Sequence, residues 1–155
     1  ATCPTSGVAR SFIDSVGIDD ASGGASAAQR LVETVGPDGL VIVAGPRGDK
    51  RSEERVRGFR SVTEPARTLH AHGWGAEDGA MVAPAALGAG VRGVFCCNDR
   101  LAEAVILSAE RSGRAIPKLI GFDDAPVAAR LGITTLAIPW DALVGEAVDV
   151  TRERL

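Results

Sequence analysis

GVFCCNDRLAEAVILSAERSG, residues 93–113, places a short apolar run directly before an amphipathic stretch. The run of residues 93–97 is typical of a strand that is buried on both faces. Asn98 and Asp99 interrupt it, and they suit the N-terminus of the helix that the following residues predict. Two polar side chains therefore follow a buried strand, which is where ligands bind in open α/β sheets. The alternative is that Asn98 only caps the helix.

The rest of the chain repeats this alternation of strand and helix about four times. Residues 40–44, LVIVA, are entirely apolar and predict a central parallel strand. Further strands are predicted at 15–19, at 68–72 as an edge, within 116–122, and as an extended segment at 133–138. Helices are predicted at 25–35 after a turn at 20–24, at 52–60 with Ser52 as cap, at 77–87 with interruptions, at 99–112, in a short turn or helix at 125–132, and at 141–155; residues 1–14 are predicted as a loop. This order predicts an α/β fold, a three-layer sandwich with a mostly parallel sheet between helices.

Polar residues follow three of the predicted strands. They occupy residues 47–55, 98–99 and 123–124. Because parallel strands end at one edge of a sheet, these groups should lie together there. The coincidence favours a binding site over three separate helix caps.

Composition excludes several classes of function. The net charge of the 155 residues is −3, and the densest basic stretch, residues 47–60, is interleaved with acids, so this chain by itself is a poor nucleic-acid binder. It has no apolar run of membrane-spanning length and no signal peptide at its start. Cys3, Cys96 and Cys97 form an odd set without metal spacing, which favours reduced thiols and a cytoplasmic protein. Asp123 with Asp124, and His70 with His72, are incomplete as metal sites, so we predict no metal and no cofactor.

The chain also resembles the effector-binding region of the lactose-repressor/galactose-repressor (LacI/GalR) transcription regulators. Five blocks carry the resemblance in family order: VGIDD with GG at 16–24, AGP at 44–46 with SEERVRGFR at 52–60, VFCCND at 94–99, GFDDAP at 121–126, and TT to P at 134–139 with Gly145 and Ala147.

The resemblance implies a periplasmic-binding-protein-like fold of two lobes, of which this chain holds mainly one, with flavodoxin-like topology. Residues 1–15 would be a remnant of the N-terminal lobe with the first crossover. Residues 16–133 would form the C-terminal lobe, and residues 134–155 the return crossover and a helix of the N-terminal lobe. The DNA-binding headpiece would be absent. Val144, Ala147, Val148 and Thr151 should face a core, or stay exposed where that lobe is missing.

The resemblance also implies which residues bind the effector. Arg55 would clamp sugar hydroxyls or a carboxylate, and Asn98 and Asp123 would hydrogen-bond hydroxyl groups. Trp74 would stack on a sugar, Trp140 would lie near the hinge, and Arg51 is a further candidate. The alternatives are that Arg55 pairs with Glu53 or Asp99, that the two aspartates form a turn, and that both tryptophans are core residues.

The function implied is that of a sugar-sensing domain in a bacterial transcription regulator. Its partners would be a small effector, operator DNA through the absent headpiece, and a second copy in a homodimer, with no membrane. A periplasmic-type sugar-binding protein of a transporter has the same fold and is the main alternative. An enzyme on a flavodoxin-like fold is a third, and it is disfavoured because the loops of the predicted site contain no histidine for a nucleophile–base pair.

Overall fold

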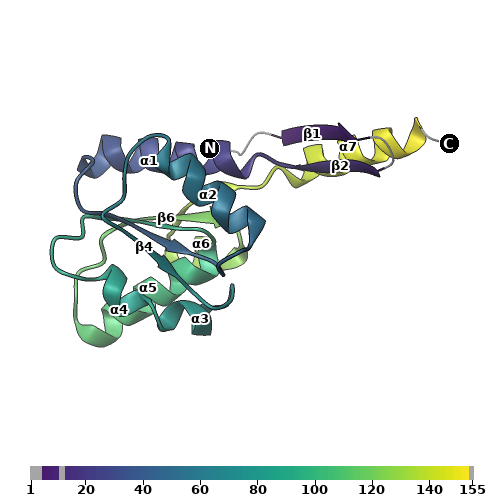
Figure 1. Ribbon diagram of the computed structural model, residues 1–155. Coiled ribbons are helices and arrows are strands. Elements are labelled where there is room, and N and C mark those ends of the chain that lie inside the picture. The colour runs from purple at the N-terminus through teal and green to yellow at the C-terminus, as the bar shows by residue number, and fades with distance from the viewer. Residues whose placement is uncertain (1–4, 11–12, 154–155) are drawn as a thin grey trace.

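A five-stranded parallel sheet forms the centre of the protein in the computed structural model, which describes residues 5–10 and 13–153 (Figure 1). The strands lie in the order β4-β3-β5-β6-β7. They are β3 (Leu40–Ala44), β4 (Arg67–His70), β5 (Gly93–Cys96), β6 (Lys118–Asp123) and β7 (Thr134–Ala137). Counted along this sheet, the order is 2-1-3-4-5, which is the flavodoxin-like order that the resemblance implies.

The apolar composition of the strands explains their places in the sheet. All five residues of β3 and all four of β5 are buried, because helices cover both faces of these inner strands. The strand β4 is only partly buried and lies at one edge, as predicted for residues 68–72. At the other edge, β7 pairs with β6, so the sheet extends into residues 134–137, which the sequence assigned to the return crossover.

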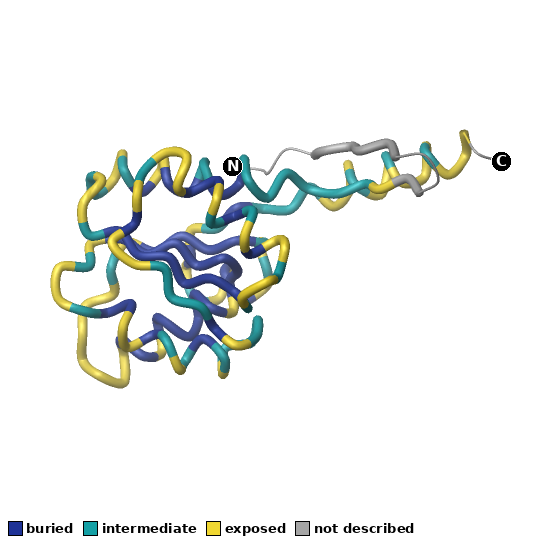
Figure 2. The backbone as a smooth tube through the Cα atoms, viewed as in Figure 1, coloured by how far each residue is buried: buried dark blue, intermediate teal, exposed yellow. Residues whose placement is uncertain are grey.

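Helices form the two outer layers of the sandwich (Figures 1 and 2). One face of the sheet packs against α1 (Asp20–Val35) and α2 (Lys50–Arg60), and its core includes Leu31, Phe59 and Cys97. The opposite face packs against α4 (Ala83–Ala86), α5 (Asp99–Ser112) and α6 (Pro126–Leu131), while α3 (Ala76–Ala80) packs on α5. Cys96 lies in this second core, so the two adjacent cysteines are free thiols that point to opposite faces; Cys3 lies outside the described residues.

Two helices begin earlier than the sequence predicted. Asp19 caps α1 by accepting hydrogen bonds from the Ser22 amide at 2.9 Å and the Ser22 hydroxyl at 2.7 Å, so the predicted turn at 20–24 is wrong. Asp49 caps α2 by accepting from the Ser52 amide at 2.9 Å, so the assignment of Ser52 as the cap is also wrong. In both cases an aspartate that was predicted outside the helix, Asp19 at the end of a strand and Asp49 in a loop, is the residue that starts the helix.

The chain ends form a separate unit beside this body. The strands β1 (Thr5–Arg10) and β2 (Ile13–Ile18) pair with each other in an antiparallel hairpin, and α7 (Trp140–Arg152) lies along β2 (Figure 1). The prediction of a loop is therefore wrong for residues 5–10 and 13–14, whereas residues 1–4 and 11–12 lie outside the described residues. The strand predicted at 15–19 exists, but its partner is β1 and not the parallel sheet.

The helix α7 contains no buried residue, which contradicts the prediction that its apolar face meets a core. Trp140, Val144 and Val148 are 62%, 60% and 41% exposed. Their spacing of four residues places them on one face, which stays open as expected for a helix without its partner layer. Among the described residues, no helix combines the length and apolarity that a membrane span requires.

Candidate functional site

Three strands end at one cavity of about 300 Å³ at the carboxyl edge of the sheet. The connection after β3 leads into α2, the one after β5 into α5, and the one after β6 into α6. Between β3 and β5 the strand order reverses, and in open α/β sheets this is the position of the ligand crevice. The cavity is lined by Asp49, Arg51, Arg55, Trp74, Asn98 and Asp123.

Five of the six residues predicted to bind an effector therefore meet at this cavity. Trp140 is not among the lining residues, because it lies at the start of α7, which lies beside the hairpin. Its role in binding stays a prediction. Asp49 lies in the polar group predicted at 47–55 but was not singled out as a binding residue; it joins the lining because it caps α2 beside Arg51.

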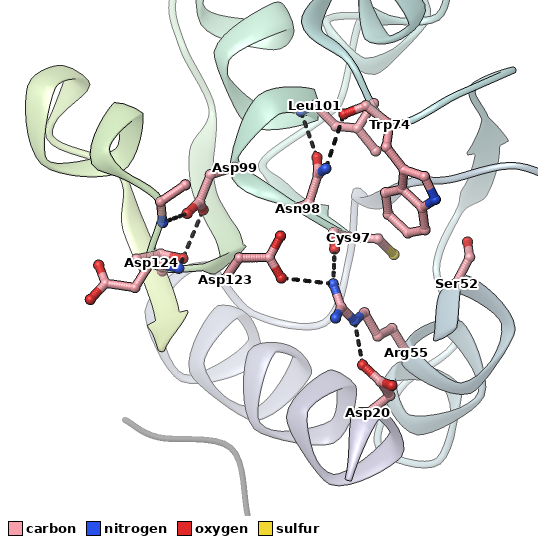
Figure 3. A network of polar contacts seen from close by, with 12 residues as sticks. Asp20, Ser52, Arg55, Trp74, Cys97, Asn98, Asp99, Leu101, Asp123 and Asp124 are labelled. Atoms are coloured by element: carbon pink, nitrogen blue, oxygen red, sulfur yellow. Dashed lines mark hydrogen bonds and ion pairs between the residues drawn. The ribbon is translucent and has the colours of Figure 1, made fainter. Parts of the chain in front are cut away.

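Arg55 is almost entirely buried, with 2% of the residue exposed. Its Nε donates to Asp20 Oδ1 at 2.6 Å, and its Nη1 donates to the Cys97 carbonyl oxygen and to Asp123 Oδ1, the latter at 3.3 Å (Figure 3). The guanidinium also lies over the Phe122 ring, with its central carbon 3.6 Å from the ring centroid. Two carboxylates therefore compensate its charge, and the predicted alternative of a surface pair with Glu53 or Asp99 is wrong.

Asp20 completes this ion-pair network, although no role was predicted for it. It is the first residue of α1, and α1 packs tightly on α2, which carries Arg55. The two helices approach closely at glycines: a Cβ at Gly24 would lie 2.0 Å from the Arg55 carbonyl oxygen. The Gly23-Gly24 pair was the available signal, but it also fits a turn, so the sequence could not distinguish the two.

Asn98 caps α5 and also makes a hydrogen bond to the backbone of Trp74. Its Oδ1 accepts from the Leu101 amide at 2.8 Å, and its Nδ2 donates to the Trp74 carbonyl oxygen at 3.0 Å (Figure 3). The prediction that Asn98 caps the helix is thus confirmed, but the alternative that it does nothing else is wrong, because it also donates to Trp74 and lines the cavity. The amide still has one hydrogen and one lone pair that these two bonds do not use. Asn98 consequently positions the Trp74 backbone and retains capacity for a ligand hydroxyl.

The half-buried indole of Trp74 packs on the backbone of Gly45. A Cβ at Gly45 would lie 2.5 Å from Trp74 Cζ2, so only glycine at this position leaves room for the ring. Trp74 contacts both core clusters and also lines the cavity. It is therefore partly a core residue, as one alternative predicted, and partly a wall of the candidate site.

Asp123 ends β6 with its side chain one-third exposed. Burial raises the pKa of its carboxyl from the ordinary 3.8 to about 6; the Arg55 guanidinium opposes this rise, and the nearby Asp99 and Asp20 add to it. A carboxyl of this kind changes charge close to neutral pH. Among the residues that the structure describes, no group of three His, Cys, Asp or Glu side chains could hold a metal ion, so the two aspartates 123 and 124 have no such partners.

The raised pKa of Asp123 predicts an unusual dependence of stability on pH. Between about pH 4 and pH 6 the folded chain retains a proton on this carboxyl that the unfolded chain has lost, so the contribution of Asp123 to the free energy of unfolding falls as the pH rises. Urea unfolding of the parent and of D123N across pH 4–7 should show that the parent loses stability relative to the variant over this interval. A difference in the free energy of unfolding between the parent and D123N that is constant with pH would contradict the prediction.

Residues 10–132 match the family model described as "Periplasmic binding protein domain". The HTH-type transcriptional regulator CelR of Thermobifida fusca is 32% identical to 96% of this chain, which spans 47% of that relative. The chain thus covers about half the length of the relative that it matches.

Solved structures of known proteins show a similar fold. The CelR–cellobiose complex superposes with a TM-score of 0.78 at 25% identity, over 88% of this chain and 45% of that one. A periplasmic solute-binding protein of an ABC transporter from Actinobacillus succinogenes, with bound D-allose, has a TM-score of 0.77 at 22% identity, over 88% of this chain and 53% of that one. A LacI-family transcriptional regulator from Burkhoderia phymatum has a TM-score of 0.70 at 25% identity, over 78% of this chain and 48% of that one. Together with the sequence match to CelR and the CelR–cellobiose complex, it confirms the resemblance to the effector-binding region of LacI-type regulators. The chain belongs to the periplasmic binding protein domain family.

Proposed function

We propose that this chain is the sugar-binding part of a LacI-type transcription regulator and that the cavity at the ends of β3, β5 and β6 holds an uncharged sugar. The observation that carries the proposal is the compensated guanidinium of Arg55 beside a carboxylate and a half-buried indole. The relative from Thermobifida fusca is named as a transcriptional regulator, and the structural neighbour named CelR is a complex with cellobiose. Sugars in two structural neighbours of this fold support the class of ligand.

Each lining residue has a chemical role in this proposal. The Asp123 carboxylate accepts hydrogen bonds from one or two hydroxyl groups, and Asn98 uses its remaining hydrogen and lone pair. The Trp74 ring offers an apolar face to the C–H face of a sugar. Arg51, on the first turn of α2, donates from the outer wall.

The charges favour a neutral ligand over an anionic one. Arg55 could in principle hold a carboxylate or sugar hydroxyls, but its Nε and Nη1 already donate to acceptors within the protein. The cavity carries the carboxylates of Asp49 and Asp123 and, on its outer wall, the exposed guanidinium of Arg51, and Asp20 lies behind Arg55. An added phosphate or carboxylate would meet these negative charges without an uncompensated buried cation to receive it. We therefore expect hydroxyl groups, not acid groups, to be recognised.

The proposal extends to the protein from which this domain comes. The hairpin β1–β2 and α7 would belong to a second lobe and its crossovers, and the open apolar face of α7 would pack there. Sugar bound between the lobes would change the affinity of a homodimer for operator DNA in the cytoplasm through a headpiece, as a ligand that favours one of two states must. The chain itself would perform no catalysis. The complete gene distinguishes this proposal from a transporter's binding protein, by a helix-turn-helix or a signal peptide upstream.

A thermal-shift panel on the protein expressed from its complete gene tests the class of ligand. Neutral mono- and disaccharides should include compounds that raise the melting temperature, because a ligand at 100 times its Kd adds about 2.7 kcal/mol to the free energy of unfolding. Sugar phosphates, sugar acids and purines should not. Stabilisation by sugar phosphates alone would contradict the proposal.

Replacing Trp74 tests the role of the ring. W74A should weaken the binding of the stabilising sugar by about threefold to tenfold, the effect of losing an aromatic stacking contact worth about 0.5–1.5 kcal/mol. W74F is the matched control, because it keeps an aromatic face, and it should bind the sugar nearly as well as the parent. Isothermal titration calorimetry measures both, and equal affinities for W74A and the parent would remove Trp74 from the site.

A further inference from the structure

The buried carboxylate of Asp99 lies next to the cavity in sequence but does not line it. It is the first residue of α5, directly after Asn98, and none of its surface is exposed. Its side chain points to the connection between β6 and α6 (Figure 3). Asp99 Oδ2 accepts from the Ala125 amide at 2.7 Å, and Oδ1 accepts from the Thr135 hydroxyl at 2.7 Å.

These bonds hold a strained part of the backbone. Asp123 and Asp124 have φ angles of 102° and 56°, in the region that favours glycine. Residues other than glycine persist in this region only where their surroundings hold them. The Asp124 amide donates to Thr135 Oγ1 at 3.3 Å, and the Thr135 hydroxyl in turn donates to Asp99. The backbone amides of Asp124 and Ala125, which directly follow Asp123, are therefore both connected to Asp99. The Ala125 amide bonds to it directly, and the Asp124 amide is connected through Thr135.

The sheet leaves space for this carboxylate at a glycine. A Cβ at Gly121 would lie 2.1 Å from Asp99 Oδ1, and Gly121 is the register partner of Thr135 across β6 and β7. The carboxylate of Asp99 thus reaches the space between β6, which ends at the candidate site, and its neighbour β7. Its two oxygens accept from two different donors, which a neutral amide could not do, because an amide has only one acceptor atom.

We propose that Asp99, acting directly and through Thr135, is a positioning residue that holds the Asp123 carboxylate against Arg55 at the cavity. Its consequence for sugar binding rests on the function proposed above, whereas its effect on Asp123 does not require a ligand. Asp99 touches neither the cavity nor Arg55. It acts on the site through the backbone that carries Asp123.

The test compares variants at adjacent positions of β7. T135V removes the hydroxyl and keeps the shape, and T135S keeps the hydroxyl. T134V makes the same exchange at an exposed neighbour whose hydroxyl makes no hydrogen bond in the described structure. D99N is a second disrupting variant. The carboxyl carbon of Asp123 is followed by ¹³C NMR during a pH titration without sugar, and circular dichroism checks that each variant is folded.

In T135V, which keeps the charge of Asp99, we expect the pKa of Asp123 to fall by a unit or more from about 6, since a released carboxyl becomes more solvated. D99N should lower it further, because that exchange also removes the neighbouring negative charge, so T135V is the deciding variant. T135S and T134V should titrate as the parent does. An unchanged Asp123 titration in folded T135V would overturn the inference.

Sugar binding separates the two proposals. If the parent binds a neutral sugar, T135V should bind it about tenfold more weakly and T135S should restore the affinity. A parent that binds no sugar, while the Asp123 titration shifts as expected, would overturn the proposed function and leave the positioning role supported. If the parent binds sugar, and T135V has the same affinity and the same Asp123 titration as the parent, the positioning role alone would be overturned.

Discussion

Replacing Arg55 with leucine should lower the free energy of unfolding by about 3–5 kcal/mol, the usual cost of removing one partner from a buried ion pair. The guanidinium is the only group that the described structure places between Asp20 and Asp123 as an ion-pair partner of both. Without it the carboxylate of Asp20, whose side chain is only 11% exposed, loses its ion-pair partner. The Cys97 carbonyl oxygen loses its side-chain donor as well. Urea unfolding followed by circular dichroism measures the loss.

R57L is the control on the same helix. Arg57 pairs with Glu54 one turn away, and their side chains are 68% and 36% exposed. An exposed ion pair contributes less than about 1 kcal/mol, so R57L should change stability little. Equal effects of R55L and R57L would show that the buried network does not stabilise the fold and that Arg55 is free to serve a ligand.

Replacing Gly58 with alanine should destabilise the protein by about 3 kcal/mol, at the upper end of the cost of overpacking. A Cβ at Gly58 would lie 1.8 Å from the carbonyl oxygen of Ala21, which is backbone and cannot rotate away. The helices α1 and α2 would have to separate. Asp20 and Arg55 lie on these two helices, so their ion pair would lengthen at the same time.

G145A is the matched control for this exchange. Gly145 lies inside α7, and an added Cβ there meets no atom within 4 Å. Alanine is a better helix former than glycine by about 1 kcal/mol, so G145A should not lower stability. Urea unfolding of both variants tests the contrast. If G58A is as stable as the parent, the close contact between α1 and α2 does not determine the geometry of the site.

The sequence predicted the inner sheet well because its signals are local. The run at 40–44 is apolar throughout, and helices bury both faces of the strand that it forms. Asn98 was recognised as a cap because capping depends on a residue three positions away. The gathering of Arg55, Asn98 and Asp123 at one cavity also followed from local patterns, since the carboxyl ends of parallel strands share an edge.

The remaining features depend on contacts between distant segments. The role of Asp20 requires knowing that Gly24 and Gly58 let two helices approach, and each glycine alone is equally typical of a turn. The hairpin at the start of the chain required the pairing of residues 5–10, which read as polar and irregular. The apolar face of α7 looks like that of any core-facing helix, because its sequence does not reveal whether a partner layer is present.

The proposed binding place of an uncharged sugar is the cavity between β3, β5 and β6. Indole NMR during a sugar titration tests this most directly. The chain has two tryptophans, and W74F assigns their signals by removing one of them. We predict that a neutral sugar that stabilises the protein shifts the Trp74 indole signal and the Asp123 carboxyl signal to saturation with one affinity. A sugar that binds while both signals stay unchanged would contradict the account.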